Sequence, residues 1–155
     1  LESKYELIRR KKPLLAKQNS KVSTYEIRDN FLRFWFRFIY PFQSLIERQL
    51  FAPLRGNISN HYEDYSGRVL EQYFHDKVME SGQYTQVGNW WNRKGQNEID
   101  LIAINEFDHT GIIAEVKRNP KKINLQKLAE KAAALPSKDF APYHLQPHPL
   151  SLSDM

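Results

Sequence analysis

The chain contains no cysteine. Disulfide bonds and zinc sites built on thiolates are therefore excluded, and nothing in the sequence indicates an oxidising compartment. Long hydrophobic runs are missing too, because the densest apolar stretch, residues 31–42, contains Arg33 and Arg37 and is too short to cross a bilayer. No secretory signal is visible, so we expect a cytoplasmic protein. A GxxxxGK[ST] loop is absent as well, which excludes a P-loop nucleotide site within these residues.

The composition fits one domain with a small appendage. With 155 residues, of which 41% are hydrophobic, the chain can bury a core. The net charge of +5 favours a polyanionic partner such as nucleic acid, although an excess of this size is also common among proteins that bind none. His144 and His148 have a ligand-like spacing, but they lie in a proline-rich stretch, so we do not expect a zinc site there.

Two apolar runs rich in Ile, Val and Ala, residues 98–104 and 111–117, flank a short stretch of turn formers and predict a β-hairpin. Alternation along the second run places Glu115 and Lys117 on the same face, roughly 7 Å apart. Asp100 lies on the neighbouring strand among apolar residues. Charges in such surroundings are costly unless they are paired or bind something.

Carboxylates on neighbouring strands suit a hard cation. Asp100 and Glu115 would supply the oxygen ligands that Mg²⁺ or Mn²⁺ prefers, and Lys117 would orient an attacking water or stabilise charge that develops on phosphorus. The alternative is that the acids form ordinary salt bridges with Lys117, Arg118 or Lys94. An acidic residue is followed about fifteen residues later by Glu-x-Lys, and both lie on apolar strands. This combination favours a metal site or the evolutionary remnant of one.

The pattern Asp100…Glu115-Val116-Lys117 resembles the PD-(D/E)XK nuclease superfamily, although Ile99 stands where the superfamily's name has proline. The resemblance implies a further metal or water ligand, a glutamate on the first core helix. Glu71 matches that position, at the border of the apolar stripe of a helix predicted for residues 65–79. The alternative for Glu71 is a solvated position at the helix edge.

A closer resemblance covers most of the chain. Residues 25–39 (YEIRDNFLRFWFRFI), together with 88–91, 98–100 and 115–117, are similar to the C-terminal region of prokaryotic AAA+-like ATPases, the archaeal ATPase C-terminal or DUF234 type. In such proteins a P-loop ATPase precedes a winged-helix lid and a nuclease-like domain. The resemblance implies a fragment in which residues 1–60 are a partial winged-helix wing plus a linker helix and residues 61–155 are the PD-(D/E)XK nuclease-like domain. ATP would bind only the N-terminal module.

The expected fold class is α/β, a restriction-endonuclease-like mixed sheet flanked by helices, preceded by a β-ribbon (the winged-helix wing remnant) and an aromatic helix. Asp29 would cap that helix, which runs from about Asn30 to Tyr40. Because a helix that is apolar on nearly every side is usually buried, we favour packing over a role as a stacking platform for nucleic acid bases. The other expected elements are strands at 5–15 and 22–27, a linker at 51–60, a helix at 61–81, strands at 84–92, 97–104 and 111–117, a helix at 124–135 and a strand within 143–152.

Basic and aromatic residues near the carboxylates predict a nucleic acid surface. Adjacent tryptophans in a strand face opposite sides, so one of Trp90 and Trp91 is expected to be partly exposed and available for stacking. Ordinary surface cover and a solvated charge run are the alternatives. The candidate nucleic-acid-binding residues are Trp91, Arg93, Lys94, Arg118, Lys121 and Lys122.

Together these patterns predict Mg²⁺- or Mn²⁺-dependent hydrolysis of DNA. Asp100 and Glu115 would hold the metal, Glu71 would support it and Lys117 would serve the water or the transition state. Expected partners are DNA and the parent ATPase module in cis. The sequence leaves open whether the chain forms a homo-oligomer. The alternatives are a non-catalytic DNA-binding or partner-docking regulatory module of the parent ATPase, and a fragment that serves mainly to assemble that ATPase. The intact set of four residues favours the enzyme.

Overall fold

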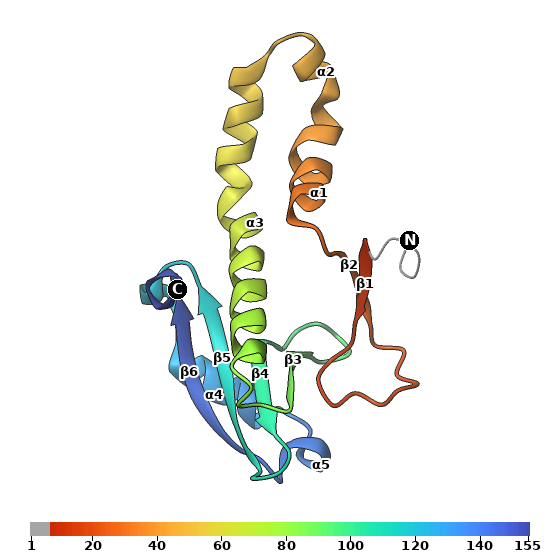
Figure 1. Cartoon of the computed structure of the whole chain (residues 1–155). Coiled ribbons are helices and arrows are strands. Elements are labelled where there is room, and N and C mark those ends of the chain that lie inside the picture. Colours follow the sequence, from red (N-terminus) through yellow and green to blue (C-terminus); the bar gives the residue numbers. More distant parts are fainter. Residues whose placement is uncertain (1–6) are drawn as a thin grey trace. The chain divides into compact units, whose positions relative to one another are not determined.

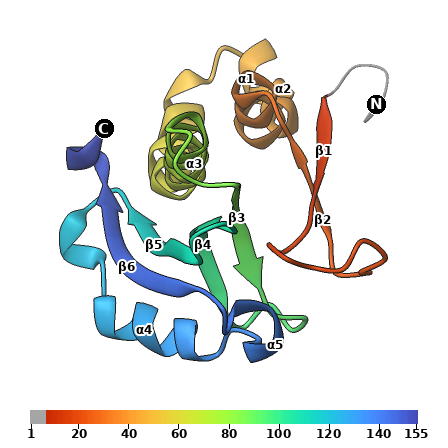
Figure 2. The ribbon, with the colours of Figure 1, turned by 60° about the horizontal axis from the view of Figure 1, so that its bottom comes forward.

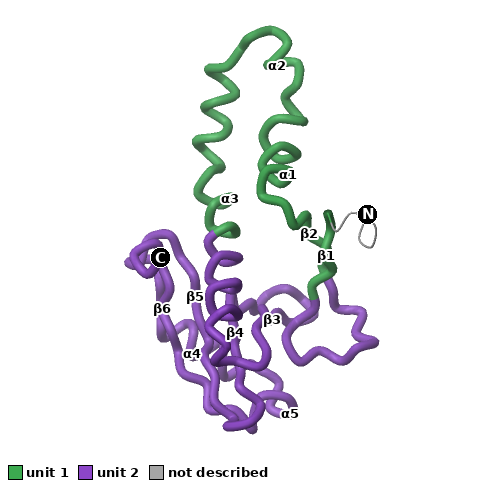
Figure 3. The backbone as a smooth tube through the Cα atoms, viewed as in Figure 1, with its two compact units in different colours: residues 1–11, 24–69 green, residues 12–23, 70–155 purple. Residues whose placement is uncertain are grey.

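The computed structural model describes residues 7–155 and divides into two compact units. The first unit contains residues 24–69 and the segment that ends at Lys11, and the second contains residues 12–23 and 70–155 (Figure 3). Both units therefore contain stretches of chain that are far apart in the sequence. We refer to residues 12–23 as the strap.

The first unit begins with an antiparallel ribbon of β1 (Ile8–Lys11) and β2 (Thr24–Ile27). The predicted first strand, residues 5–15, is much longer than β1, and its first two residues lie outside the described part of the chain. Pro13 has no N–H to continue a ladder. The next residue, Leu14, donates its N–H to the carbonyl of Asn89 in the second unit's sheet at 2.8 Å, so the strap leaves the ribbon and joins that sheet.

The aromatic segment is helical, as expected, but it is not one regular helix. Asp29 caps it through a hydrogen bond from the Leu32 N–H (2.7 Å), which confirms the predicted cap. Four short pieces follow one another: α1 (Asn30–Phe34), the π-helix η1 (Trp35–Ile39), the 3₁₀ turn η2 (Tyr40–Phe42) and α2 (Gln43–Glu47).

The expectation that this aromatic segment is buried is wrong for much of it. Phe38 is buried and packs edge-on against Tyr65 of the following helix. Phe31, by contrast, is 67% exposed, and the other exposed aromatic residues of the segment are Trp35, Phe36 and Tyr40. A two-helix hairpin offers one packing face, so a segment that is aromatic on every side leaves several rings outside it.

Residues 51–60, predicted as a linker, are instead the beginning of α3 (Phe51–Glu80). The prediction rested on Pro53, Gly56 and Asn57. Pro53 is the third residue of α3, where its missing N–H would have had no partner within the helix. An internal glycine costs a helix about 1 kcal/mol relative to alanine, which a long helix tolerates.

A four-stranded mixed sheet forms the centre of the second unit (Figure 1). The strand order is β3-β4-β5-β6, with antiparallel neighbours except for the parallel pair β5 and β6. The predicted strands and the hairpin are confirmed, with small shifts at their ends. Their bounds are β3 (Gln86–Trp91), β4 (Glu98–Asn105), β5 (Thr110–Lys117) and β6 (His144–Ser151). The remaining elements are η3 (Pro120–Lys122), α4 (Leu125–Ala133), α5 (Ser137–Phe140) and η4 (Leu152–Asp154).

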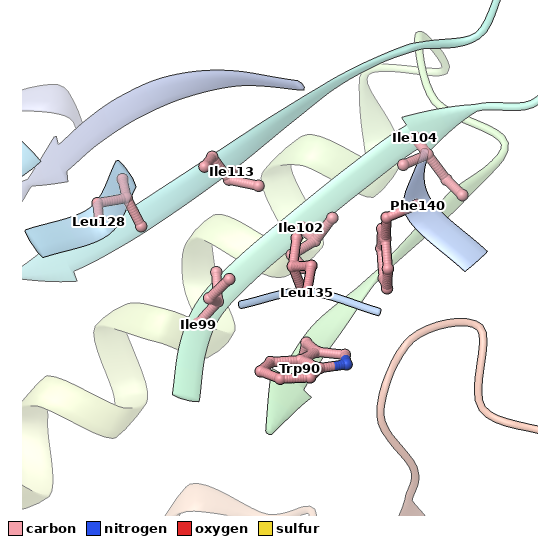
Figure 4. Close-up of a cluster of buried hydrophobic side chains, with 8 residues drawn as sticks. All are labelled: Trp90, Ile99, Ile102, Ile104, Ile113, Leu128, Leu135 and Phe140. Carbon is pink, nitrogen blue, oxygen red and sulfur yellow. The ribbon is translucent and has the colours of Figure 1, made fainter. Parts of the chain in front are cut away.

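Apolar side chains cover both faces of this sheet. On one face, α4 supplies Leu128 to a cluster that includes Trp90, the three isoleucines of β4 and Ile113 of β5 (Figure 4). On the other face, Leu70 and Phe74 from the C-terminal part of α3 pack against the same two strands, and Figure 2 shows a helix on either side of the sheet. The chain is therefore a mixed α/β protein with a sheet flanked by helices.

Two details refine this arrangement. Leu125, the first residue of α4, is 45% exposed and takes no part in the core although it is apolar. Within residues 7–155, no helix is long and apolar enough to cross a membrane.

Candidate active site

The hydrogen bonding between β4 and β5 changes at the open end of their hairpin, which is the end away from the turn. Its backbone pairs run from Asn105 opposite Thr110 to Leu101 opposite Ala114. Beyond that pair, the side chain of Asp100 replaces the backbone partner, since its Oδ2 accepts the Val116 N–H at 2.9 Å. A carboxylate is thereby held against the edge of β5, with one oxygen fixed by a main-chain donor.

The pairing of β4 with β3, on its other side, explains how the Asp100 side chain comes to face the Val116 N–H. In the β3–β4 ladder Gly88 pairs with Ile102 and Trp90 pairs with Ile99, so two residues, Asp100 and Leu101, lie opposite the single residue Asn89. This two-against-one count is a β-bulge, a device that re-aims side chains in a strand. The Asn89 side chain donates from Nδ2 to the Asp100 carbonyl within the bulge.

Lys117 joins the two strands at this point. Its Nζ lies 3.0 Å from Asp100 Oδ2 and 3.6 Å from Glu115 Oε1. Burial by itself would lower the pKa of Lys117. The charge of Asp100, its hydrogen bond and the charges of Glu115 and Glu71 act the other way, and together they raise the pKa above its ordinary value of 10.5. The side chain is therefore held as an ammonium group.

Glu115 is 7% exposed and faces α4. Its Oε2 accepts the N–H of Asn124 at 3.1 Å, and Lys131 Nζ lies 4.0 Å from its Oε1. Asn124 is also the N-cap of α4, because its side chain accepts the Lys127 N–H at 2.9 Å. The buried charge of Glu115 is thus compensated by two ammonium groups and by the positive end of a helix.

Glu71 lies half-buried on α3, near enough for its charge to raise the pKa of Lys117. The structure therefore brings all four predicted catalytic residues into one neighbourhood. Within residues 7–155, however, no group of three or more His, Cys, Asp or Glu side chains is arranged to hold a metal ion. The ammonium of Lys117 occupies the space between the two strand carboxylates.

The donor set nevertheless fits Mg²⁺. This ion is commonly bound through one or two carboxylates while several waters complete its shell. Within the described residues, the hydrogen bonds of the Asp100 carboxylate all end on Oδ2, which leaves Oδ1 available as a ligand. Glu115 would offer Oε1 if the Lys117 ammonium moved aside, and Glu71 on α3 would be the third of the predicted ligands.

The predicted nucleic-acid-binding residues fall into two places. Trp91 is half-buried at the end of β3, opposite in orientation to the buried Trp90, and Arg93 and Lys94 are exposed in the following turn. The other group directly follows Lys117 in the chain: Arg118 is half-buried, and Lys121 and Lys122 are exposed in η3. The second group thus continues from the carboxylates, as the sequence indicated.

Three groups that contact the candidate site residues were not predicted from the sequence: Asn89, Lys131 and the main-chain N–H of Asn124. A polar residue directly before Trp90, within a predicted strand, was the available signal for Asn89. For Lys131 the signal was helical spacing, because it follows the core residue Leu128 by three positions and so shares its side of α4. The amide of Asn124 had no signal, since main-chain donors are not visible in a sequence pattern.

Comparisons with known proteins place the chain in a family. Residues 35–129 match DUF234, described as archaeal and bacterial proteins of unknown function. The uncharacterized protein MJECL04 of Methanocaldococcus jannaschii is 33% identical over 152 residues, which cover 90% of this chain and 34% of the relative. The chain thus spans about a third of the length of that relative. No solved structure matches the chain.

Proposed function

The chain belongs to the DUF234 family, and we propose that its second unit is a metal-dependent DNA nuclease of the PD-(D/E)XK type. The observation that carries this proposal is the position of Lys117, whose Nζ contacts carboxylates on two adjacent strands. Asp100, Glu115 and Lys117 follow the spacing of that superfamily's motif, and the mixed sheet between two helices fits its restriction-endonuclease-like fold.

In this proposal Asp100 and Glu115 bind Mg²⁺ or Mn²⁺, and Glu71 supports the same centre from α3. The bound ion would supply an activated water and neutralise charge on the phosphate. Lys117, held as an ammonium, is suited to stabilising the negative charge that builds up on the phosphoryl oxygens rather than to removing a proton. The basic residues that follow it, from Arg118 to Lys122, would bind the DNA backbone on either side of the scissile phosphate.

Cleavage assays test the proposal directly. The purified chain is incubated with single-stranded, duplex and branched DNA in Mg²⁺, in Mn²⁺ and in EDTA, alongside Asp100→Ala and Lys117→Ala. We expect metal-dependent cleavage by the wild type alone. If the wild type cleaves no substrate in either metal, while it binds DNA equally well with and without these substitutions, the nuclease proposal is wrong.

A second function is favoured by a specific observation. Lys117 ties Asp100 to Glu115 and Lys131 adds a further cation, so the cluster is a salt-bridge network that compensates its own charges without a metal. A non-catalytic module that docks DNA or a partner on the same fold would show this arrangement. Metal titration separates the two functions, because the docking module binds neither Mg²⁺ nor Mn²⁺ at this cluster.

The archaeal relative is about three times as long as this chain, so we also consider what the rest of such a protein would do. The resemblance to prokaryotic AAA+-like ATPases supports a parent protein in which a P-loop module precedes these residues and binds ATP. In that parent the ATPase would act in cis on the nuclease unit. An ATP-hydrolysis assay on a full-length family member, compared with the present chain, tests this arrangement.

A further inference from the structure

Asn89 is a buried polar residue in the middle of an apolar strand, with 9% of its surface exposed. Its main-chain carbonyl and its side-chain amide both have hydrogen-bond partners on other segments of the chain. Its main-chain carbonyl accepts the N–H of Leu14 in the strap at 2.8 Å, and its side-chain Nδ2 donates to the carbonyl of Asp100. Since burying an amide without partners is costly, this pair of contacts gives Asn89 one favourable orientation.

The second contact lies at the bulge that places the carboxylate. Asp100 and Leu101 share Asn89 as their only opposite residue, so the ladder leaves a main-chain carbonyl of β4 in need of a donor. The Asn89 amide supplies that donor. On the other edge of β4 the same residue, Asp100, accepts the Val116 N–H and the Lys117 ammonium through Oδ2.

We propose that Asn89 is a positioning residue that fixes Asp100, and through it the metal-binding geometry of the site. The metal part of this inference rests on the proposed nuclease function, whereas the placement of Asp100 does not. Without the amide donor, the Asp100 carbonyl loses its partner and the bulge can straighten. A one-residue slip in a strand turns its side chains to the opposite face, so the carboxylate would leave the Val116 N–H.

The first readout needs no metal. Hydrogen exchange of the Val116 amide, measured by NMR in EDTA, reports directly on its bond to Asp100. Asn89→Ala should accelerate this exchange at least about tenfold relative to the amide of Ile113, which lies further along β5, as expected when one local bond opens below the global unfolding threshold. Asn89→Leu, which keeps the approximate shape but has no donor, should do the same and provides a second variant if the alanine form does not fold.

The second readout is Mn²⁺ affinity by isothermal titration calorimetry. Groups that orient a metal ligand typically change metal affinity by about 10- to 100-fold when they are removed, and we expect a loss in that range for both Asn89 variants. Asn105→Ala is the matched control. Asn105 lies in the neighbouring strand β4, at the end away from Asp100, and its Nδ2 also donates to a main-chain carbonyl, that of Gln83 at 3.1 Å. This variant should leave Val116 exchange and Mn²⁺ affinity unchanged.

The outcomes are distinguishable. Folded Asn89 variants with wild-type exchange at Val116 overturn the positioning role, whatever happens to the nuclease. If the Asn89 variants exchange faster at Val116 while the wild type binds no Mn²⁺ and cleaves no DNA, the positioning role of Asn89 is supported and the proposed function is overturned. Equal acceleration in Asn105→Ala would mean that any loss along β4 loosens the sheet, and this result also contradicts the inference.

Discussion

The two ends of the β4–β5 hairpin are built differently. At the turn end, backbone pairs continue without interruption to Asn105 and Thr110, and Phe107 in the turn is 88% exposed. At the open end the pairing stops at Leu101 and Ala114, and the Asp100 side chain accepts the Val116 N–H and the Lys117 ammonium in place of a further backbone pair. The regular end holds the strands together, and the irregular end gathers the three charged side chains of the candidate site.

The largest expected effect concerns the open end. Asp100→Ala removes a proposed metal ligand and one negative charge beside basic residues. Cleavage should fall by more than about a thousandfold, the scale seen when a single catalytic group is removed. DNA binding in EDTA should hold or tighten, because repulsion of the phosphates decreases. Fluorescence anisotropy with a labelled duplex measures the binding, and a loss of binding equal to the loss of cleavage would contradict this separation.

The turn end should respond in stability rather than in chemistry. A Cβ added at Gly111 would lie 2.5 Å from the Ala103 carbonyl oxygen and 2.8 Å from Leu145 Cδ2. Because the first of these is backbone, Gly111→Ala should destabilise the protein by about 1–3 kcal/mol, as overpacking typically does. Urea unfolding measures the change.

Metal affinity of the folded Gly111→Ala protein should equal that of the wild type. Phe107→Ala is the control for the same turn, since substitutions at exposed sites usually stay within about 0.5 kcal/mol. A loss of Mn²⁺ affinity in Gly111→Ala would remove the distinction between the two ends of the hairpin.

Glu115 tests whether the open end also supports the fold. Glu115→Ala leaves the Asn124 N–H without its partner inside the protein, so we expect a loss of about 1–2 kcal/mol, the usual cost of an unsatisfied buried donor. Glu115→Gln keeps a carbonyl oxygen for that N–H and should lose less stability. Both variants should bind Mn²⁺ weakly. If the glutamine form binds Mn²⁺ as the wild type does, Glu115 is not a ligand.

The smallest expected effect is a pH dependence in metal-free buffer. The pKa of Lys117 is raised in the folded protein, so its charge contributes stability that is fully present below the unfolded value near 10.5. This contribution is lost as the pH rises through the folded pKa. The stability difference between the wild type and Lys117→Met, measured by urea unfolding, should therefore stay constant below the unfolded pKa and shrink as the pH rises above it. A difference that stays constant would mean that the carboxylates do not favour the ammonium form.

The sequence predicted most of the second unit because its signals are local and agree with one another. Apolar runs bounded by turn residues gave the strands, and alternation placed Glu115 and Lys117 on one side of β5. The bulge at Asp100 had no such signal, because it arises from pairing with β3 across the sheet. The long α3 was hidden by Pro53 and Gly56, whose local preference for turns is overridden within a thirty-residue helix.

The first unit shows the opposite case. The aromatic segment was expected to be buried because it is apolar on nearly every side, a rule that assumes enough surrounding protein to cover it. Within its own unit the segment packs Phe34 and Phe38 against Tyr65 and leaves Phe31 and Tyr40 exposed. Its π-helical turn was also not predictable, because the additional residue in such a turn has no sequence signature of its own.

The strap gives the molecule an interleaved architecture. The chain passes from one unit to the other three times, after Lys11, after Ser23 and within α3 after Val69. No single cut in the polypeptide can therefore yield the complete sheet unit, and a fragment that begins at residue 61 omits the strap. In that fragment β3 becomes a bare sheet edge, without the Leu14 N–H on Asn89 and the Leu14 side chain against Gly88. Uncovered edges pair readily with other chains, so we expect a recombinant sheet unit without residues 12–23 to self-associate more than one that contains them.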